Sequence, residues 1–91
     1  MSDDPELVRL RARMDDVNRR LVAALHERAR LCREIGAWKR RRGLPAVDKA
    51  REQAMLDAML GEPPADGFSR GQLEAVLREV FAASRALVEG R

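Results

Sequence analysis

The sequence has little of what metal centres and disulfide frameworks are built from. It contains one cysteine, Cys32, and one histidine, His26, among its 91 residues. A lone cysteine cannot form a disulfide within the chain, and a single cysteine and a single histidine do not supply a zinc-binding set. We therefore expect no metal site and interpret both residues as structural.

Aromatic residues, β-branched residues and long apolar runs are also scarce. Tyrosine is absent, and the three aromatic residues are Trp38, Phe68 and Phe81. No apolar run approaches the length that crosses a membrane, and the acidic start MSDDPEL is unlike a signal or transit peptide. These features predict an all-α protein of the cytosol that has no membrane segment.

Charged residues are abundant, at 36% of the chain, and they leave a net charge of +3. The hydrophobic content of 45% and its clear periodicity argue against disorder. A positive balance suits nucleic acid, an acidic surface or a small anion, and it does not choose among these partners.

The longest periodic segment runs from Pro5 to about Arg42 and contains one glycine, Gly36. Its apolar residues recur at spacings of three and four, which predicts one amphipathic helix over residues 5–42. This apolar stripe consists of Leu7, Leu10, Met14, Val17, Leu21 and Leu25. Such a helix would be about 57 Å long, whereas a compact domain of this size spans only about 30–35 Å. We therefore expect a second copy of the chain to cover the stripe, forming a homodimer.

Two shorter helices follow in the same predicted domain, which covers residues 1–91. Asp48 stands where a helix N-cap belongs and predicts a helix over residues 48–60. Ser69 and Gln72 have the spacing of a capping box and predict a third helix over residues 69–89.

Several polar residues fall on the expected packing faces. Arg28 occupies a position of the stripe where an apolar residue is due, and Lys39 lies about 20° from it around the helix. Arg11 is about 25 Å from Arg28 along the same helix, too far to share its site. An antiparallel partner helix would instead bring Arg11 of one chain beside Arg28 of the other.

The two shorter helices add further polar residues. Asp48, Arg51 and Glu52 share one face of the second helix. Ser84 interrupts the apolar stripe of the third helix, and Val88 lies one turn later. The set has no nucleophile–base pair, so it suits a small polyanion that is bound and polarised electrostatically.

Each of these residues also has a structural interpretation. Arg11 fits a solvated helix, Arg28 a side chain that extends from a packing face, and Ser84 a close helix contact. Asp48 fits a plain cap, Arg51 and Glu52 a surface ion pair, and the basic run from Lys39 to Arg42 a solvated helix end.

The residues as an ordered set resemble a known family. The segments LRARMDDVNRRLVAAL, ERARLCREIGAWK, GLP, VDKARE and REVFAASRAL follow one another as in the all-helical chorismate mutases, the AroQ class. The resemblance implies an intertwined homodimer of three-helix chains that rearranges chorismate, a small dicarboxylate, to prephenate. It implies a [3,3] rearrangement that uses neither a cofactor nor a covalent intermediate.

The resemblance also implies a role for each residue of the set. Arg28, together with Arg11 of the other chain, holds the enolpyruvyl carboxylate, and Arg51 lies by the same anionic region. Ser84 lies near the ring carboxylate, and Lys39 donates to the ether oxygen. The C4 hydroxyl meets Glu52 and the backbone around Asp48.

Val88 departs from the family pattern, because that position usually carries a glutamine or glutamate as a second donor to the ether oxygen. Three explanations are open. In the first, the enzyme is a slow chorismate mutase that an activating partner protein accelerates. In the second, it rearranges 4-amino-4-deoxychorismate in antibiotic or aminophenylalanine biosynthesis, with the amine paired to Glu52. In the third, the alignment at the end of the chain is shifted and another group fills the role.

An alternative of another class is a non-enzymatic basic helical dimer that binds nucleic acid or protein. It would use Arg40, Arg41 and Arg42 as phosphate contacts. This alternative leaves Arg28 on the packing face unexplained, so we expect no nucleic-acid partner.

Overall fold

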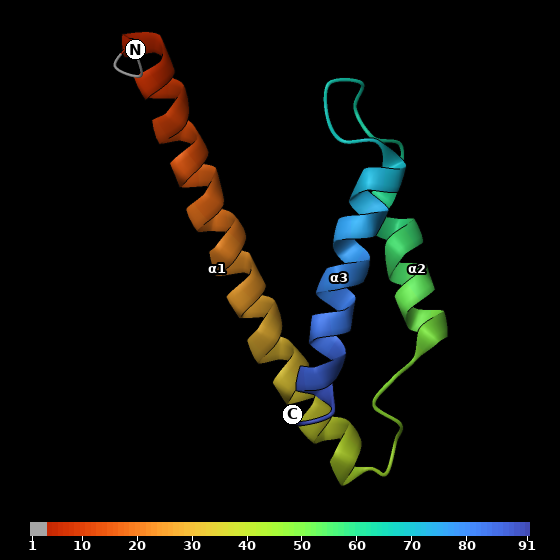
Figure 1. The fold of residues 1–91 in the computed structure, drawn as a ribbon. Helices are drawn as coiled ribbons and strands as arrows, with labels where there is room; N and C mark the ends of the chain where they lie inside the picture. The colour runs from red at the N-terminus through yellow and green to blue at the C-terminus, as the bar shows by residue number, and fades with distance from the viewer. Residues whose placement is uncertain (1–3) are drawn as a thin grey trace. The chain divides into compact units, whose positions relative to one another are not determined.

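The computed structural model describes residues 4–91, which form three helices, α1 (Pro5–Arg41), α2 (Lys49–Leu60) and α3 (Arg70–Val88) (Figure 1). The described residues contain no strand, so the predicted all-α class is confirmed. The predicted ranges 48–60 and 69–89 are each longer than the helices because they include the flanking caps Asp48, Ser69 and Glu89.

The described residues divide into two compact units, and the boundary falls within α1 between Arg30 and Leu31. In the first unit Asp4 caps α1, since its carboxylate accepts hydrogen bonds from the amides of Glu6 at 2.9 Å and Leu7 at 3.4 Å. Every described residue up to Glu27 is exposed. The apolar stripe of α1 is included, with exposed fractions of 36–58%. This part of α1 therefore carries an exposed apolar stripe along an otherwise polar helix.

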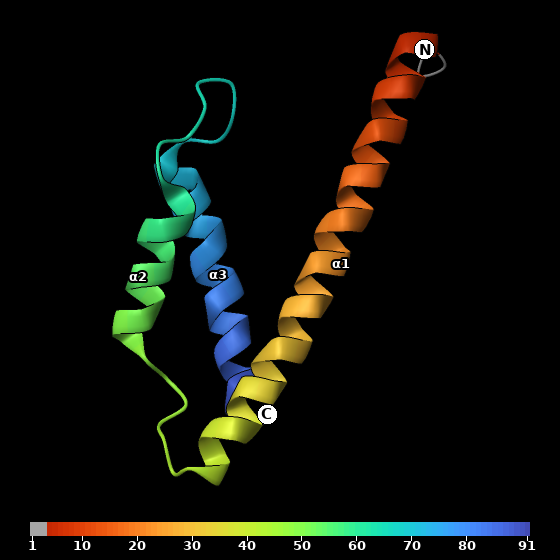
Figure 2. The same cartoon turned by 180° about the vertical axis from the view of Figure 1, so that it is seen from behind.

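In the second unit, α2 and α3 lie side by side, as Figures 1 and 2 show from opposite directions. Their contact buries a small cluster of Leu56, Leu60 and Phe81. Partly buried apolar residues surround the cluster, namely Met55, Leu73, Leu77 and Val80. This cluster holds the second half of α2 against the middle of α3.

The end of α3 packs against the last turns of α1. Gly36 is buried there, and a Cβ atom at this position would lie directly against the main-chain carbonyl of Val88. Arg40 reinforces the contact, because its Nη1 donates to the Val88 carbonyl oxygen at 2.7 Å. That bond places a cation on the negative end of the α3 dipole and satisfies one of its terminal carbonyls.

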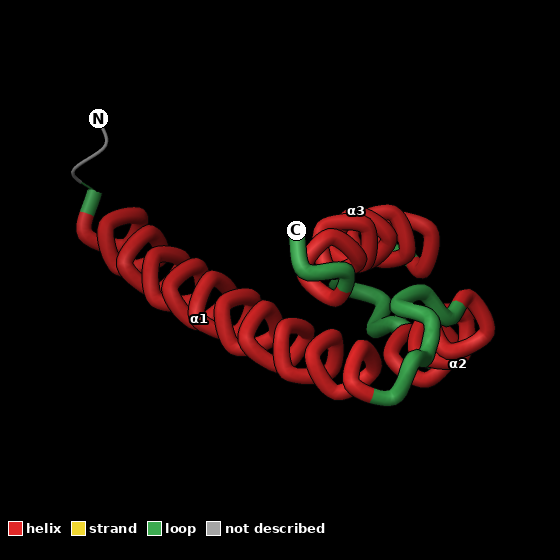
Figure 3. Tube along the Cα trace, turned by 90° about the horizontal axis from the view of Figure 1, so that it is seen from below, coloured by secondary structure: helices red, strands yellow, loops and turns green. Residues whose placement is uncertain are grey.

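Glycine ends two of the helices in a similar way. Gly43 follows α1 with a φ of 66° and its amide donates to Arg40 O at 3.2 Å, while the Leu44 amide donates to Lys39 O at 3.0 Å. Gly90, with a φ of 85°, makes the equivalent pair of bonds possible at the end of α3. Both ends are Schellman motifs, which need a left-handed residue and therefore favour glycine. Figure 3 shows the loops that link the three helices in green.

Candidate functional site

The first turn of α2 is organised by Asp48. Its side chain accepts a hydrogen bond from the Arg51 amide at 2.9 Å, and its main-chain oxygen accepts from the Glu52 amide at 3.1 Å. The N-cap predicted from the sequence is therefore present. The cap fixes the backbone from which the exposed Arg51 and the half-buried Glu52 extend.

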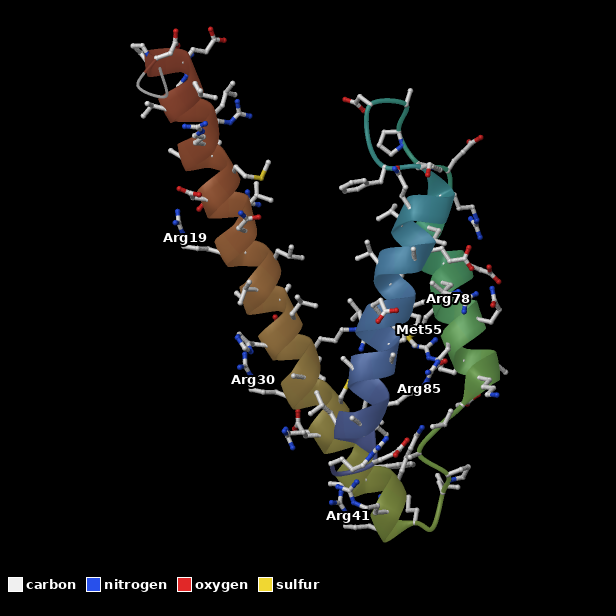
Figure 4. All side chains as sticks on the ribbon, viewed as in Figure 1. Arg19, Arg30, Arg41, Met55, Arg78 and Arg85 are labelled. Atoms are coloured by element: carbon white, nitrogen blue, oxygen red, sulfur yellow. The ribbon has the colours of Figure 1, made fainter. Side chains whose placement is uncertain are left out.

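Glu52 forms an ion pair with an arginine of α3. Arg85 donates from Nε to Glu52 Oε1 at 2.8 Å and from Nη2 to Glu52 Oε2 at 2.7 Å. The side chains are 18% exposed for Glu52 and 40% exposed for Arg85. Figure 4 shows Arg85 on the side of α3 that faces α2. A bidentate pair of this kind has fixed geometry as well as charge complementarity.

The ion pair changes the acidity of both groups. The hydrogen bonds from Arg85 hold the pKa of Glu52 below its ordinary value of 4.5, against a smaller opposing effect of burial. The same contact with Glu52 raises the pKa of Arg85. Glu52 is thus an ionised carboxylate whose charge is balanced by a neighbour.

Sequence reasoning singled out Glu52 and missed Arg85. The available signal was the spacing of four residues from Phe81, which places Arg85 one turn beyond a residue of the α3 packing face. The structure pairs Glu52 with Arg85 rather than with its neighbour Arg51.

Lys39 and Ser84 are both half-buried in the second unit. Lys39 Nζ donates to the main-chain oxygen of Ala46 at 3.2 Å, which ties the end of α1 to the loop before α2. The Ser84 hydroxyl donates to Val80 O at 2.7 Å, one turn earlier in α3. The Lys39 ammonium has two N–H donors beyond the one that binds Ala46 O, because an ammonium has three.

The basic run at the end of α1 is largely engaged within the chain. Lys39 and Arg40 bind main-chain oxygens of Ala46 and Val88. The Arg42 guanidinium stacks over the Trp38 ring, 3.9 Å from its centroid. A row of phosphate contacts requires side chains directed at a ligand, so this arrangement does not favour the nucleic-acid alternative.

Arg11 and Arg28 belong to the first unit, where Arg11 is exposed and Arg28 is half-buried. The other predicted site residues belong to the second unit; they are Lys39, Asp48, Arg51, Glu52, Ser84 and Val88. Within that unit the fold brings Glu52 to α3 and Lys39 to the loop before α2. The substrate-binding roles of all eight residues stay predictions.

Two further properties concern the described part of the chain. Residues 4–91 contain no group of three or more histidine, cysteine, aspartate or glutamate side chains that could hold a metal ion. None of the helices described is long and apolar enough to span a membrane.

Comparison with known proteins gives the class of the protein. The model of the family described as chorismate mutase type II matches residues 10–89. The chain belongs to this family, and the resemblance to the all-helical chorismate mutases is confirmed. The matched range includes every predicted site residue from Arg11 to Val88.

Individual relatives agree with this class. The chain is similar to a solved chorismate mutase (form II) of Thermus thermophilus, with a TM-score of 0.86, 37% identity, and coverage of 92% of this chain and 94% of that one. It is also similar to the T-protein of Enterobacter agglomerans, 38% identical over 79 residues that make up 87% of this chain and 21% of the T-protein. The T-protein of Haemophilus influenzae is 35% identical over 77 residues, or 85% of this chain and 20% of that protein. The chain thus spans about a fifth of the length of the T-proteins it matches.

Proposed function

We propose that the protein is an isomerase that converts chorismate to prephenate by a [3,3] rearrangement. The observation that carries the proposal is the family match over residues 10–89, which extends across all three helices and every predicted site residue. The likeness to the Thermus chorismate mutase over 92% of the chain supports it.

The rearrangement needs electrostatic stabilisation more than reactive groups. In one step the C–O bond of the enolpyruvyl ether breaks and a C–C bond forms, so no atom is gained or lost and no proton has to move. Negative charge grows on the ether oxygen as its bond to carbon breaks. Donors aimed at that oxygen therefore lower the barrier, because they bind the transition state more tightly than the substrate.

We assign the donor role to Lys39. Its ammonium spends one N–H on Ala46 O, a contact that orients the side chain and leaves two donors for a ligand. Arg11, Arg28 and Arg51 supply positive charge for the two substrate carboxylates. Ser84 would donate its hydroxyl to the ring carboxylate in place of the Val80 main-chain oxygen that it contacts in the free chain. The α2 N-terminus at Asp48 and Glu52 meets the C4 hydroxyl.

We further propose that the active form is a homodimer, in which the three-helix chain forms a single domain and each site takes Arg11 from the other chain. The exposed apolar stripe of α1 supports this proposal, since side chains that are 36–58% exposed in one chain would be covered by a second copy. A continuous apolar helical face is also a common dimer interface.

A direct assay tests the activity. We expect purified protein to consume chorismate and form prephenate, measured by the loss of chorismate absorbance and by chromatography of the product. Lys39→Met should lower kcat on the order of a hundredfold, the usual cost of losing a donor to a developing oxyanion. The control is Lys49→Met, at the exposed first residue of α2, which should leave kcat unchanged. If chorismate is not consumed, even with a cell extract added to supply an activating partner, the proposal is wrong.

A further inference from the structure

Glu52 does not present a free carboxylate to the C4 position of a substrate. Both of its oxygens already accept hydrogen bonds from one guanidinium, at 2.8 and 2.7 Å. A carboxylate has about four acceptor positions, so roughly two remain for a ligand. The pair as a whole carries no net charge.

The Glu52–Arg85 ion pair is less exposed and makes more contacts than the Asp57–Arg70 ion pair between the same two helices. Arg70 reaches Asp57 with one contact of 3.4 Å, and the side chains there are 48% and 61% exposed. Glu52 is only 18% exposed and is held at two points. Less water around Glu52 means that charges near it are screened less, so a nearby positive group on a ligand has a larger effect.

The charge balance distinguishes two groups at C4. A neutral hydroxyl can donate to a remaining lone pair of Glu52, and its dipole is little affected by Arg85. A protonated amine at the same place would be attracted by Glu52 and repelled by the guanidinium that Glu52 holds. An isolated carboxylate would favour the amine, whereas this pair removes most of that advantage.

We propose that Arg85, acting through Glu52, is a specificity-determining residue that selects a substrate with a C4 hydroxyl over its 4-amino analogue. The inference rests on the proposed function, because it assumes that Glu52 faces C4 of the bound substrate. It implies that the substrate is chorismate rather than 4-amino-4-deoxychorismate, although Val88 supplies no second donor to the ether oxygen. Arg85 is a positioning residue in this role and has no part in the chemical step.

The test is the ratio of kcat/KM for chorismate to kcat/KM for 4-amino-4-deoxychorismate. We expect the wild-type protein to prefer chorismate. Arg85→Met removes the guanidinium and should lower the ratio at least tenfold, mainly through better use of the amino substrate. Arg85→Lys keeps a positive charge beside Glu52 and should retain most of the preference.

Arg70→Met is the matched control, because it also removes an ion pair from α3 to α2 but leaves Glu52 untouched. It should keep the wild-type ratio. A loss of folded protein changes both rates together and leaves the ratio unaffected, so the ratio separates specificity from stability. If Arg85→Met does not fold, Arg85→Gln gives the same comparison with a polar neutral side chain.

The outcomes separate the two proposals. Turnover of chorismate with a ratio that neutral Arg85 variants leave unchanged would overturn the specificity inference and leave the proposed function standing. A wild-type preference for the amino substrate would overturn it as well. No turnover of either substrate would remove the proposed function itself.

Discussion

Val88 contributes to the structure through its main chain, while its side chain has no hydrogen-bonding group. The carbonyl oxygen accepts from Arg40 at 2.7 Å, and the isopropyl group is half-buried at the end of α3. The proposed site therefore has one side-chain donor fewer at this position than a glutamine would give. Arg40 binds the backbone, so a substitution of the side chain leaves that contact in place.

Val88→Gln should raise kcat for chorismate, by up to on the order of a hundredfold, if the added amide reaches the ether oxygen. Val88→Met is the matched control, because it has a similar length and no N–H donor. Steady-state kinetics of the two variants measure the difference. Equal rates would mean that position 88 does not face the ether oxygen and that another group fills the role.

Protonation of Glu52 lowers the free energy of unfolding as the pH falls. Its pKa in the folded chain lies below the ordinary value of 4.5, so the ion pair stabilises the fold fully above that pH. The stabilisation is lost as pH falls through the folded-state pKa and the carboxylate takes up a proton. Glu52→Gln should therefore be less stable at pH 7 and lose less stability between pH 6 and pH 3 than the wild type.

Urea denaturation across this pH range measures the effect. Asp57→Asn serves for comparison, because it removes the single-contact pair with Arg70, whose side chains are more exposed. We expect Asp57→Asn to lose less stability at pH 7 than Glu52→Gln does, since exposed single-contact ion pairs contribute little. If Glu52→Gln follows the wild-type curve, the pair with Arg85 does not contribute to acid sensitivity.

The residue scale also shows where sequence reasoning ends. Asp48 and Ser69 were predicted as caps because capping depends on neighbours only three residues away, and both are confirmed. The pair of Glu52 and Arg85 joins residues 33 positions apart. No local spacing encodes such a contact, since it depends on how α2 and α3 pack.

At the scale of the helices, Gly36 permits the close approach of α1 and α3. An exposed glycine within a helix is replaced by alanine with a gain of about 1 kcal/mol. Here the added Cβ would meet the Val88 carbonyl, which is backbone and cannot rotate away. Gly36→Ala should instead destabilise the protein by about 1–3 kcal/mol, as overpacking does.

The control for this prediction is Gly71→Ala in the first turn of α3. A Cβ atom there meets nothing within 4 Å, so this variant should be neutral or slightly more stable. Thermal or urea unfolding of both variants makes the comparison. Equal stability of the two variants would show that α1 and α3 are not in contact at Gly36 in solution.

The helices themselves were predictable because their signals are local. Periodicity, the Ser69–Gln72 capping box and the glycines at the ends set all three helices to within a residue of their observed bounds. The packing of the last α1 turns on α3 was not predictable. A glycine within a helical pattern indicates only a weak helix former until the opposing Val88 carbonyl is known.

At the scale of the whole molecule, the predicted apolar stripe of α1 is present and exposed. The length of the stripe was predictable from the sequence, whereas the surface proposed to cover it belongs to a second chain. The homodimer and the sharing of Arg11 between chains therefore stay proposals that need an experiment with two kinds of chain.

Mixing Arg11→Ala with Arg28→Ala chains tests both ideas. Each variant alone should be inactive, because every site lacks one arginine. In a mixed dimer one site combines the intact Arg28 of one chain with the intact Arg11 of the other. Random re-pairing makes about half of the dimers mixed, each with one intact site of two, so about a quarter of wild-type activity should return.

The control mixes each variant with more of itself, which should restore nothing. Sedimentation and exchange of tagged chains establish that mixed dimers form. Mixed dimers without activity would show that Arg11 does not act across the interface, and a monomer at assay concentration would contradict the dimer.

Trp38 is the one tryptophan of the chain and directly precedes Lys39. Its ring lies under the Arg42 guanidinium. The protein thus carries a built-in optical reporter beside the residue proposed to contact the ether oxygen. Its fluorescence reports on the end of α1 without any label and without interference from tyrosine, which the sequence lacks. Intrinsic fluorescence of Trp38 can therefore be used to follow ligand binding and local unfolding at this end of the helix.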